Sequence, residues 1–337
     1  MIGQAPAFWS RPGSWRGALL SPIGHVIGAI TLRQMARPGA VIAVPVLCVG
    51  NPTVGGAGKT PTTLMVLSHL KARGARPFAL LRGHGGRLAG PVRVDPTRHD
   101  AAAVGDESLL LAAEAPTIVS RDRVAGARLA VAEGATHIVM DDGFQNPSLT
   151  KDVTLLVIDG AAGVGNGRVL PAGPLRAPLA PQIALADAVL LVGEGAAGAA
   201  VGTMARQAGK VVLEASIVPD ATTIAALRGQ RVLAFAGIGR PEKLAMTLAE
   251  AGIEVARLRA FPDHHPYSAG DIAGLMDEAD DAGLTLVTTS KDLARLNGAA
   301  FSTFASRITA LPVRMEVSDA AALDDLLARA SMRSASR

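Results

Sequence analysis

The sequence contains few aromatic residues and a single cysteine. Aromatic residues make up 3% of the 337 residues, whereas hydrophobic residues as a whole make up 49% and charged residues 18%. The lone Cys48 excludes a disulfide scaffold and a cysteine-rich metal site, and it is compatible with a reducing compartment. A core of small aliphatic side chains is typical of a β-sheet that helices cover closely. The composition therefore indicates a folded α/β protein and not a disordered chain.

Acidic residues are missing from the first quarter of the chain. The first is Asp95, which eleven lysines and arginines precede, so the remaining residues carry 22 basic against 29 acidic side chains. A wholly cationic quarter favours an anionic partner, such as lipid headgroups, nucleotide phosphates or nucleic acid. Because no stretch in this quarter interleaves basic with aromatic residues, we expect no nucleic-acid partner. Nothing in the sequence predicts an obligate protein partner.

Residues 8–37 combine an apolar helical pattern with both tryptophans of the chain. Trp9 and Trp15 lie beside arginines, and apolar residues recur at spacings of four and three, namely Leu19, Ile23, Ile27 and Ile30. Polar residues interrupt this run before it reaches the ~20 apolar residues of a transmembrane helix, and a signal peptide also fits poorly. We predict that residues 1–37 form an amphipathic segment in a membrane interface. The alternative is a helix packed on the protein's own core.

Residues 50–60 form a glycine-rich turn between a predicted strand and a predicted helix. The apolar residues 41–49 precede the turn, and leucines at positions 64, 67 and 70 follow it at helical spacing. This is the context of a P-loop, in which backbone N–H groups and a helix N-terminus surround phosphate oxygens. Lys59 would reach the β- and γ-phosphates of ATP, and the Thr60 hydroxyl would bind Mg²⁺. The predicted ATP-binding residues are Thr53, Val54, Gly55, Gly56, Ala57, Gly58, Lys59 and Thr60.

Two pairs of acidic residues could serve a metal ion and a proton transfer. Asp141 and Asp142 end an apolar strand over residues 137–142, which is the pattern of a metal-binding carboxylate at the carboxyl end of a strand. A plain turn is the alternative. Asp106 and Glu107 could cap and start a helix, or one of them could receive the proton of an acceptor hydroxyl. The residue types alone leave both possibilities open.

Several short motifs follow one another along the chain. In order they are VGN at 49–51, TVGGAGKT at 53–60, RGHG at 82–85, GDE at 105–107, DDGFQ at 141–145, GNGR at 165–168, LPAGPLR at 170–176, FPDHH at 261–265 and SKD at 290–292. Through these motifs the chain resembles the tetraacyldisaccharide 4'-kinase (lipid A 4'-kinase) family over nearly its whole length. Thr53, where the general P-loop consensus has glycine, is typical of this family. His84, Asn146 and Ala177 depart from the family, in which tyrosine, histidine and an acidic residue are usual at these positions.

The resemblance implies a fold and an activity. The fold would be a P-loop NTPase-like α/β sheet with helices on both faces, plus a second, smaller α/β domain. The activity would be transfer of the ATP γ-phosphate to the 4'-hydroxyl of a tetraacylated glucosamine disaccharide 1-phosphate, which gives lipid IVA in lipid A biosynthesis. ATP and Mg²⁺ would be the cofactors. The lipid substrate would place the enzyme peripherally on the anionic lipid surface at the cytoplasmic face of the bacterial inner membrane.

The resemblance also implies roles for individual residues. Asp106 would form an acid–base dyad with His264, although the adjacent His265 leaves the register open, and Lys59 and Asp142 would complete the catalytic set. The implied Mg²⁺ ligands are Thr60, Glu107, Asp141, Asp142 and Gln145. The residues expected to meet the substrate or its phosphates are Asn51, Arg82, Arg168 and Arg176.

The order of the apolar runs predicts two α/β domains joined around residues 210–230. We expect a P-loop kinase core over residues 38–215 and a smaller domain over residues 216–337. If Asp106 belongs to the first and His264 to the second, closure of the cleft would assemble the dyad and exclude water. We also expect a substrate-facing loop over residues 160–181 and a surface connection over residues 193–200. Residues 308–317 are expected to form a single strand.

Two other kinds of P-loop protein are alternatives to a kinase. A GTPase or metal-delivery ATPase would need a guanine-reading Asn-Lys-x-Asp for GTP, and residues 290–292 lack both the asparagine and the spacer. A non-catalytic membrane nucleotide sensor would bind ATP without turnover, and the presence of Asp106 and His264 argues against it. An ATP-dependent kinase is therefore the favoured interpretation.

Overall fold

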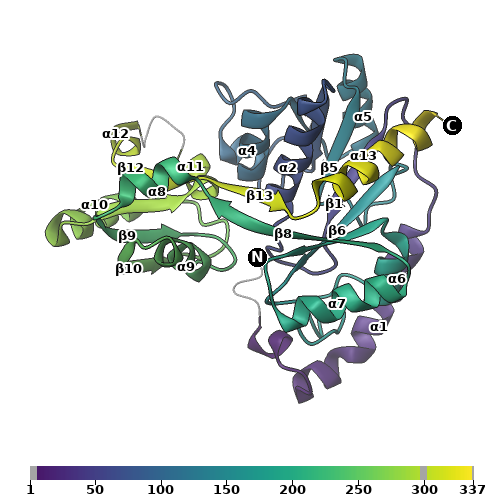
Figure 1. Cartoon of the computed structure of the whole chain (residues 1–337), viewed down its shortest axis with the longest axis horizontal. Helices are drawn as coiled ribbons and strands as arrows, with labels where there is room; N and C mark the ends of the chain where they lie inside the picture. The colour runs from purple at the N-terminus through teal and green to yellow at the C-terminus, as the bar shows by residue number, and fades with distance from the viewer. Residues whose placement is uncertain (1–5, 297–301, 336–337) are drawn as a thin grey trace.

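The computed structural model describes residues 6–296 and 302–335, which form two α/β domains side by side (Figure 1). Within these residues the larger domain contains a nine-stranded sheet in the order β13-β8-β7-β6-β1-β5-β2-β4-β3, and the smaller domain contains a four-stranded sheet in the order β10-β9-β11-β12. Neighbouring strands run parallel except in the pairs β13–β8 and β3–β4. The architecture is thus that of two α/β units joined by a pair of strands.

The strands of the large sheet are β1 (Val46–Gly50), β2 (Pro77–Leu81), β3 (Val92–Arg93), β4 (Thr117–Val119), β5 (His137–Asp141), β6 (Val153–Asp159), β7 (Ala188–Val192), β8 (Val211–Pro219) and β13 (Val313–Val317). The helical segments of this domain are η1 (Ala7–Ser10), α1 (Trp15–Met35), α2 (Lys59–Ala72), α3 (Ala101–Val104), α4 (Asp106–Glu114), α5 (Arg123–Ala132), α6 (Leu179–Leu185), α7 (Ala196–Gln207) and α13 (Ala320–Ala335).

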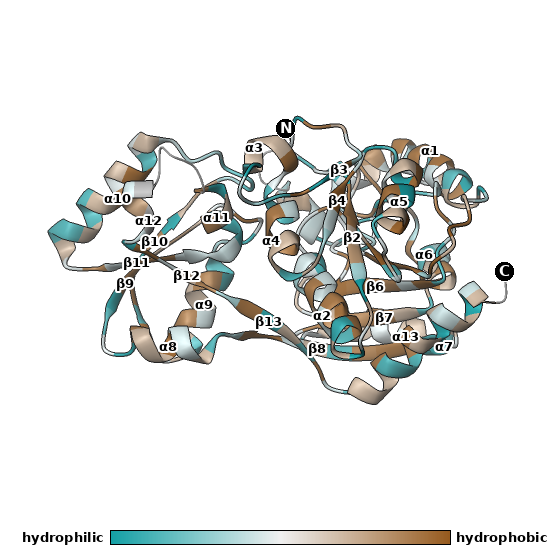
Figure 2. Ribbon diagram, turned by 90° about the horizontal axis from the view of Figure 1, so that it is seen from above, coloured by the Kyte–Doolittle hydropathy of each residue, from teal (hydrophilic) through white to brown (hydrophobic). Residues whose placement is uncertain are grey.

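Helices cover both faces of the large sheet, because alternate strand residues point to opposite faces. In β1, Leu47 and Val49 join a core cluster with side chains of α2, α4 and α13, whereas Val46 and Cys48 join a second cluster with side chains of α5, α6 and α7. Figure 2 shows the hydrophobic colouring concentrated on the strands of this sheet. The central strand therefore carries the P-loop at its carboxyl end on a rigid, doubly covered base.

The smaller domain repeats this layered arrangement. Its strands are β9 (Arg231–Ala236), β10 (Glu254–Ala260), β11 (Thr285–Thr289) and β12 (Ile308–Leu311), and its helices are α8 (Ala221–Leu227), α9 (Glu242–Glu250), α10 (Ala269–Ala282), α11 (Ser290–Arg295) and α12 (Ser302–Ala305). Side chains of α8 and α9 pack on one face of β9, and side chains of α10 pack on the other. The loop that follows β10 and the start of α11, directly after β11, contact the large domain and contribute His264 and Lys291 to the site described below.

Two strands of the large sheet connect the domains. The chain leaves through β8 and returns through β13, which pairs antiparallel with β8 from Val313 opposite Pro219 to Val317 opposite Ala215 (Figure 1). The expectation of one strand over residues 308–317 is wrong, because Pro312 separates β12 in the small sheet from β13 in the large sheet. Proline lacks the N–H that a continuous ladder requires. Residues from Val313 onward, which we assigned to the smaller domain, therefore pack on the larger one.

Helix α7 replaces the surface connection expected over residues 193–200. It begins at Ala196 and runs to Gln207, with Val201 and Ala205 buried against the sheet. Alanine has the highest helix propensity. The alanines within residues 196–200 therefore favour a helix, although glycines also occur in this stretch. Gly198 also fits a close approach, since a Cβ there would lie 2.5 Å from the Gly160 Cα.

Helix α1 lies on the surface of the large domain. Its buried residues are Gly17, Gly24 and Gly28, and each approaches the segment over residues 166–178 so closely that a Cβ would meet atoms at 2.7 to 3.3 Å. Among the helices of the described residues, none combines the length and the apolar character that crossing a membrane requires. The predicted helix is therefore present, and it packs on the domain through glycines.

Candidate active site

The P-loop runs from β1 to α2. Gly58 precedes α2 with φ 91°, a left-handed backbone conformation that favours glycine, and Lys59 is the first helical residue. Lys59 Nζ lies 3.1 Å from Asn51 Oδ1 and 3.8 Å from Asp142 Oδ1. Asn51 is fully buried and also donates to the Gly55 carbonyl at 3.2 Å. Asn51, predicted to meet the substrate, therefore lies beneath the P-loop and holds its shape.

The expected loop from residue 160 ends at residue 178, where α6 begins at Leu179, and it supports the first half of the P-loop. Thr53 forms a β-bridge with Leu175, and the Val54 N–H donates to the Pro174 carbonyl at 2.9 Å. A Cβ on Gly55 or Gly56 would meet no described atom within 4 Å, so this part of the backbone is accessible from the cleft. This accessibility is what a backbone cradle for phosphate oxygens requires.

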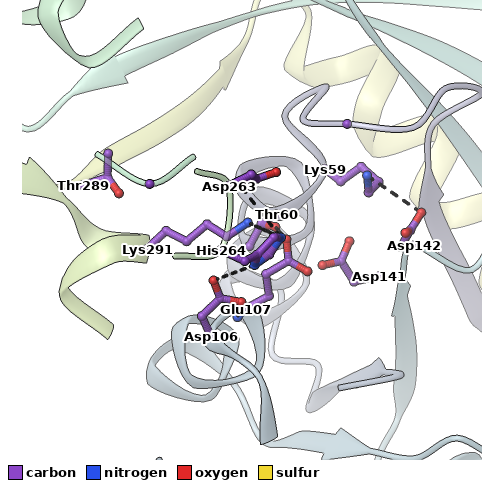
Figure 3. Close-up of polar contacts among 12 residues, drawn as sticks. Lys59, Thr60, Asp106, Glu107, Asp141, Asp142, Asp263, His264, Thr289 and Lys291 are labelled. Atoms are coloured by element: carbon purple, nitrogen blue, oxygen red, sulfur yellow. Dashed lines mark hydrogen bonds and ion pairs between the residues drawn. The ribbon is translucent and has the colours of Figure 1, made fainter. Parts of the chain in front are cut away.

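Asp141 ends β5 beside the P-loop and Asp142 follows it, but the surroundings of the two side chains differ. Asp141 is buried, and its Oδ1 accepts a hydrogen bond from Thr63 at 3.1 Å. Among the described residues its Oδ2 has no hydrogen-bond partner, although Figure 3 shows the side chain directed towards Glu107. Burial and the neighbouring charge of Glu107 raise the pKa of Asp141 to about 7.

Asp142 has φ 52° and forms a two-point contact with Arg176, whose Nη1 and Nη2 lie 2.8 and 3.0 Å from its carboxylate oxygens. Burial opposes ionisation here too, but the charges of Lys59 and Arg176 hold the pKa of Asp142 below its usual value. Arg176 Nε also donates to the Thr53 carbonyl at 3.0 Å. Arg176 therefore ties the end of β5 to the P-loop.

Asp106 and Glu107 start α4 and face opposite partners. Gly105, with φ 86°, precedes them. Glu107 Oε1 accepts a hydrogen bond from Thr60 Oγ1 at 3.3 Å, which places this carboxylate at the first turn of α2. Asp106 is 5% exposed, and its Oδ2 lies 3.1 Å from His264 Nδ1 of the small domain (Figure 3). The two carboxylates thus connect the P-loop helix with the other side of the cleft.

The structure distinguishes the two adjacent histidines. His264 has φ 59°, contacts Asp106 through Nδ1, and directs Nε2 towards Lys291 at 3.4 Å. His265 stacks on Phe261 and contacts Asp271 within its own domain. Burial alone would raise the pKa of Asp106, but its hydrogen bond with His264 and the charge of Lys291 outweigh burial and keep this pKa well below the usual range.

The remaining predicted residues lie in three places. Arg82 lines a cleft of about 360 Å³ together with His84, Glu107, Asp141 and Arg176. Gln145 is held by three partners: it donates to the Asn51 carbonyl and to Gln182 Oε1, and it accepts from Arg176. Arg168 lies elsewhere, where it hydrogen-bonds Ser21 of α1. The structure therefore brings the predicted residues together except Arg168, which belongs to the contact with α1.

Comparison with known proteins identifies the family of the chain. A family model described as Tetraacyldisaccharide-1-P 4'-kinase matches residues 16–331. The chain belongs to this family. A tetraacyldisaccharide 4'-kinase of Azorhizobium caulinodans is 64% identical over 337 residues, with all of both chains covered, and one of Xanthobacter autotrophicus is 56% identical over 336 residues, with 98% of each covered.

A solved structure, "apo" form LpxK from Aquifex aeolicus in complex with ATP, has a TM-score of 0.73 and 26% identity to this chain. The match covers 94% of this chain and 99% of that one. The family resemblance inferred from the motifs and the predicted α/β P-loop fold are thereby confirmed, and with them the prediction of a kinase.

This member of the tetraacyldisaccharide 4'-kinase family has cleft residues to which the sequence assigned no role. Lys291 Nζ lies 3.2 Å from Glu107 Oε1, and although burial opposes it, the charges of Glu107 and Asp106 raise the pKa of Lys291. Arg295 Nε donates to Asp106 Oδ2 at 2.7 Å. Residues 290–292 were recognised as a motif, but a short motif gives no indication of a contact across 184 positions of the chain.

Proposed function

We propose that the chain transfers the γ-phosphate of ATP to the 4'-hydroxyl of tetraacyldisaccharide 1-phosphate and so forms lipid IVA. The observation that carries the proposal is the contact between Asp106 and His264, which come from different domains and meet beside Thr60 at the P-loop helix. A GTPase switch or a passive sensor would have no need of an acid–base pair at this position. Membership of the family supports the same conclusion.

ATP binding is supported by the shape of the P-loop. The accessible backbone at Gly55 and Gly56 and the N-terminus of α2 favour the β- and γ-phosphates. Lys59 is held by Asn51 at the start of the same helix. A lysine at this position neutralises phosphate charge. The relative from Aquifex aeolicus was solved in complex with ATP.

The acidic residues at the cleft fit a magnesium ion. Mg²⁺ is usually bound by one or two carboxylates together with substrate phosphates and water. In keeping with such a site, the described residues contain no group of three or more histidine, cysteine, aspartate or glutamate side chains that could hold a metal ion by themselves. Asp141 supplies a buried Oδ2 that has no hydrogen-bond partner in the described part of the chain, and Glu107 and Thr60 lie together opposite it (Figure 3). When bound, Mg²⁺ neutralises charge on the phosphoryl oxygens. Asp142 and Gln145 are engaged by Arg176, so we assign them a supporting position around this site.

The proton of the acceptor hydroxyl leaves through the dyad. In the proposed reaction the bond between the γ-phosphorus and the bridging oxygen breaks, a bond to the 4'-oxygen forms, and the 4'-hydroxyl proton passes to the Asp106–His264 pair. Asp106 holds Nδ1 of His264, so Nε2 is the nitrogen that faces the cleft. ADP leaves with the electron pair of the broken bond. The cleft lined by Arg82 and Arg176 offers positive charge to the phosphorylated sugar.

Variants of the dyad test this assignment. In mixed micelles with ATP, Mg²⁺ and the disaccharide 1-phosphate, the wild-type protein should form a bis-phosphorylated lipid. Asp106→Asn and His264→Ala should each lower kcat by roughly 10²–10⁴-fold, the range of general acid–base catalysis. His265→Ala is the matched control and should stay within a few-fold of wild type. Near-normal turnover by both dyad variants would show that the assignment is wrong.

We infer that the protein binds peripherally to the anionic lipid surface at the cytoplasmic face of the inner membrane, and the exposed side chains of helix α1 support binding to such a surface. Its glycine face packs on the domain, whereas its apolar side chains point outward: Trp15, Leu19, Ile23, Val26, Ile27 and Ile30 are all exposed. Arg33 stands in its last turn, and no acidic residue occurs in its first turn. An apolar helix face bordered by arginines is typical of interfacial binding. Such binding would leave the acyl chains in the bilayer while the sugar enters the cleft.

Vesicle binding tests the role of α1. A Leu19→Glu, Val26→Glu double variant should bind vesicles of phosphatidylethanolamine and phosphatidylglycerol more than tenfold more weakly than wild type. Each change removes an apolar side chain that would be buried in the lipid surface, and each adds a negative charge that the anionic lipid repels. Met246→Glu provides the control, since Met246 is also more than half exposed but lies on α9 of the small domain. Equal vesicle binding by the wild type and the α1 variant would exclude the interfacial role.

A further inference from the structure

Lys291 is a half-buried cation at the point where the two domains meet. It is the second residue of α11, directly after β11 of the small sheet. Its Nζ lies 3.2 Å from Glu107 Oε1 and 3.4 Å from His264 Nε2, and its side chain is 22% exposed. Lysine is usually exposed, because burying an ammonium group costs free energy unless it is paired. This position therefore calls for an explanation beyond a surface charge.

The contacts place Lys291 over the P-loop helix. Glu107 Oε1 accepts from Lys291 on one side and from Thr60 Oγ1, at 3.3 Å, on the other. Figure 3 shows the Lys291 side chain extended across the cleft towards Thr60 and Glu107, while Lys59 approaches from the other side. Two lysines from different domains thus flank the space beside the P-loop helix. His264 Nε2, which faces the acceptor in the proposed reaction, borders the same space.

We propose that Lys291 is a catalytic residue whose ammonium group binds oxygens of the transferring γ-phosphoryl group, opposite Lys59. The proposal rests on the kinase function given above and names a further residue of that site. In phosphoryl transfer, charge is spread over the three equatorial oxygens of a loose transition state, and preorganised cations stabilise it. Lys291 keeps its proton throughout: the hydroxyl proton goes to the dyad, and the bond between phosphorus and the bridging oxygen breaks as the bond to the 4'-oxygen forms.

The position of Lys291 in the small domain links catalysis to closure. Lys59 is present at the P-loop whether or not the domains approach each other, whereas Lys291 reaches this space only when α11 lies against α4. Water that enters an open cleft would then meet ATP without this second cation. Transfer to water is thereby disfavoured until the domains have closed around the lipid acceptor.

A structural tie between the domains is the competing explanation, and the chain contains its own control. Lys243 of α9 also forms an ion pair across the cleft, 2.6 Å from Asp159 Oδ2 at the end of β6. This pair involves neither Glu107 nor Thr60. If lysines of the small domain serve only to hold the cleft closed, Lys243→Gln and Lys291→Gln should have similar effects.

Steady-state kinetics and transition-state mimicry separate these explanations. We expect Lys291→Gln to lower kcat roughly 10²–10³-fold, which is the loss typical of removing one preorganised donor. Its KM for ATP should change less than about threefold. Lys291→Arg should recover part of kcat because arginine keeps the positive charge. With Mg²⁺ present, Lys291→Gln should weaken binding of ADP with aluminium fluoride far more than binding of ADP alone. Lys243→Gln should change none of these quantities more than a few-fold.

The outcomes are distinct. The proposal is overturned if Lys291→Gln loses no more kcat than Lys243→Gln, or if its binding of ADP falls as much as its binding of ADP with aluminium fluoride. Thermal unfolding of each variant shows whether a loss of kcat comes from misfolding. If Lys291→Gln is misfolded, the kcat of Lys291→Arg decides between the catalytic and the structural explanation. If the wild-type protein itself forms no phosphorylated lipid, the proposed function fails. A wild type that is active beside an equally active Lys291→Gln variant refutes only the role of Lys291.

Discussion

Arg295 makes a buried ionic connection between the domains, and replacing it tests how much the folded protein depends on that connection. Its Nε donates to Asp106 of the large domain at 2.7 Å, and its Nη1 lies 2.7 Å from both Asp292 Oδ1 and the Gly237 carbonyl. The side chains of Arg295, Asp106 and Asp292 are 6%, 5% and 0% exposed. An Arg295→Met variant would leave two buried carboxylates without their shared cation.

The size of the expected loss in stability depends on the hydrogen-bond donors that Asp106 and Asp292 retain in the variant. Removing one partner of a buried ion pair costs about 3–5 kcal/mol. Asp292 retains the donors Gly237 N–H, Tyr267 hydroxyl and Thr289 hydroxyl, and Asp106 retains its contact with His264. We therefore expect a loss at the lower end, about 3 kcal/mol of the free energy of unfolding.

Urea unfolding followed by circular dichroism measures this loss, because the midpoint shifts in proportion to the free energy of unfolding when the slope is unchanged. Both tryptophans lie near the N-terminus, so their fluorescence would report the small domain poorly. Arg257→Met is the matched control: Arg257 is half-exposed in its pair with Glu278, and such pairs contribute about 0–1 kcal/mol. A loss of less than about 1 kcal/mol for Arg295→Met, equal to this control, would refute the reasoning.

Two further predictions concern the metal site and the start of α4. Because burial raises the pKa of Asp141 to about 7 and only the ionised carboxylate binds Mg²⁺, affinity for Mg²⁺ in the presence of ADP should be about tenfold weaker at pH 6 than at pH 8. Calorimetry should show that Asp141→Asn loses this extra dependence, and an unchanged dependence would exclude Asp141 as a ligand. Gly105→Ala should destabilise the protein more than Gly74→Ala in thermal unfolding, since both have positive φ but only at Gly105 would a Cβ lie 2.5 Å from the His84 carbonyl oxygen. Equal losses would show that backbone conformation alone matters at Gly105.

Local sequence patterns predicted those parts of the site that lie on a single strand and on the loop that follows it. The P-loop after β1 and the carboxylates after β5 lie as expected, because the carboxyl ends of parallel strands meet at one edge of a sheet. The sequence favoured His264 for the acid–base pair but left the register open, since His264 and His265 are adjacent and identical in type. The structure places the two side chains differently: Phe261 stacks on His265, while His264, with its positive φ, contacts Asp106.

Contacts that depend on how distant segments pack could not be predicted in the same way. The return of β13 to the large sheet depends on pairing with β8 almost 100 positions earlier, and only the interruption at Pro312 hints at it. Lys291 and Arg295 reach Glu107 and Asp106 because α11 packs against α4. Their residue types alone are equally consistent with solvated positions on a helix surface.

The position of the transferred phosphate tests the central claim most directly. The purified protein should be incubated with ATP, Mg²⁺ and tetraacyldisaccharide 1-phosphate in mixed micelles, and the lipid product examined by mass spectrometry and phosphorus NMR. The account predicts one added phosphate, as a monoester on the 4'-oxygen, together with an equal amount of ADP. Formation of ADP with inorganic phosphate and an unchanged lipid would contradict it.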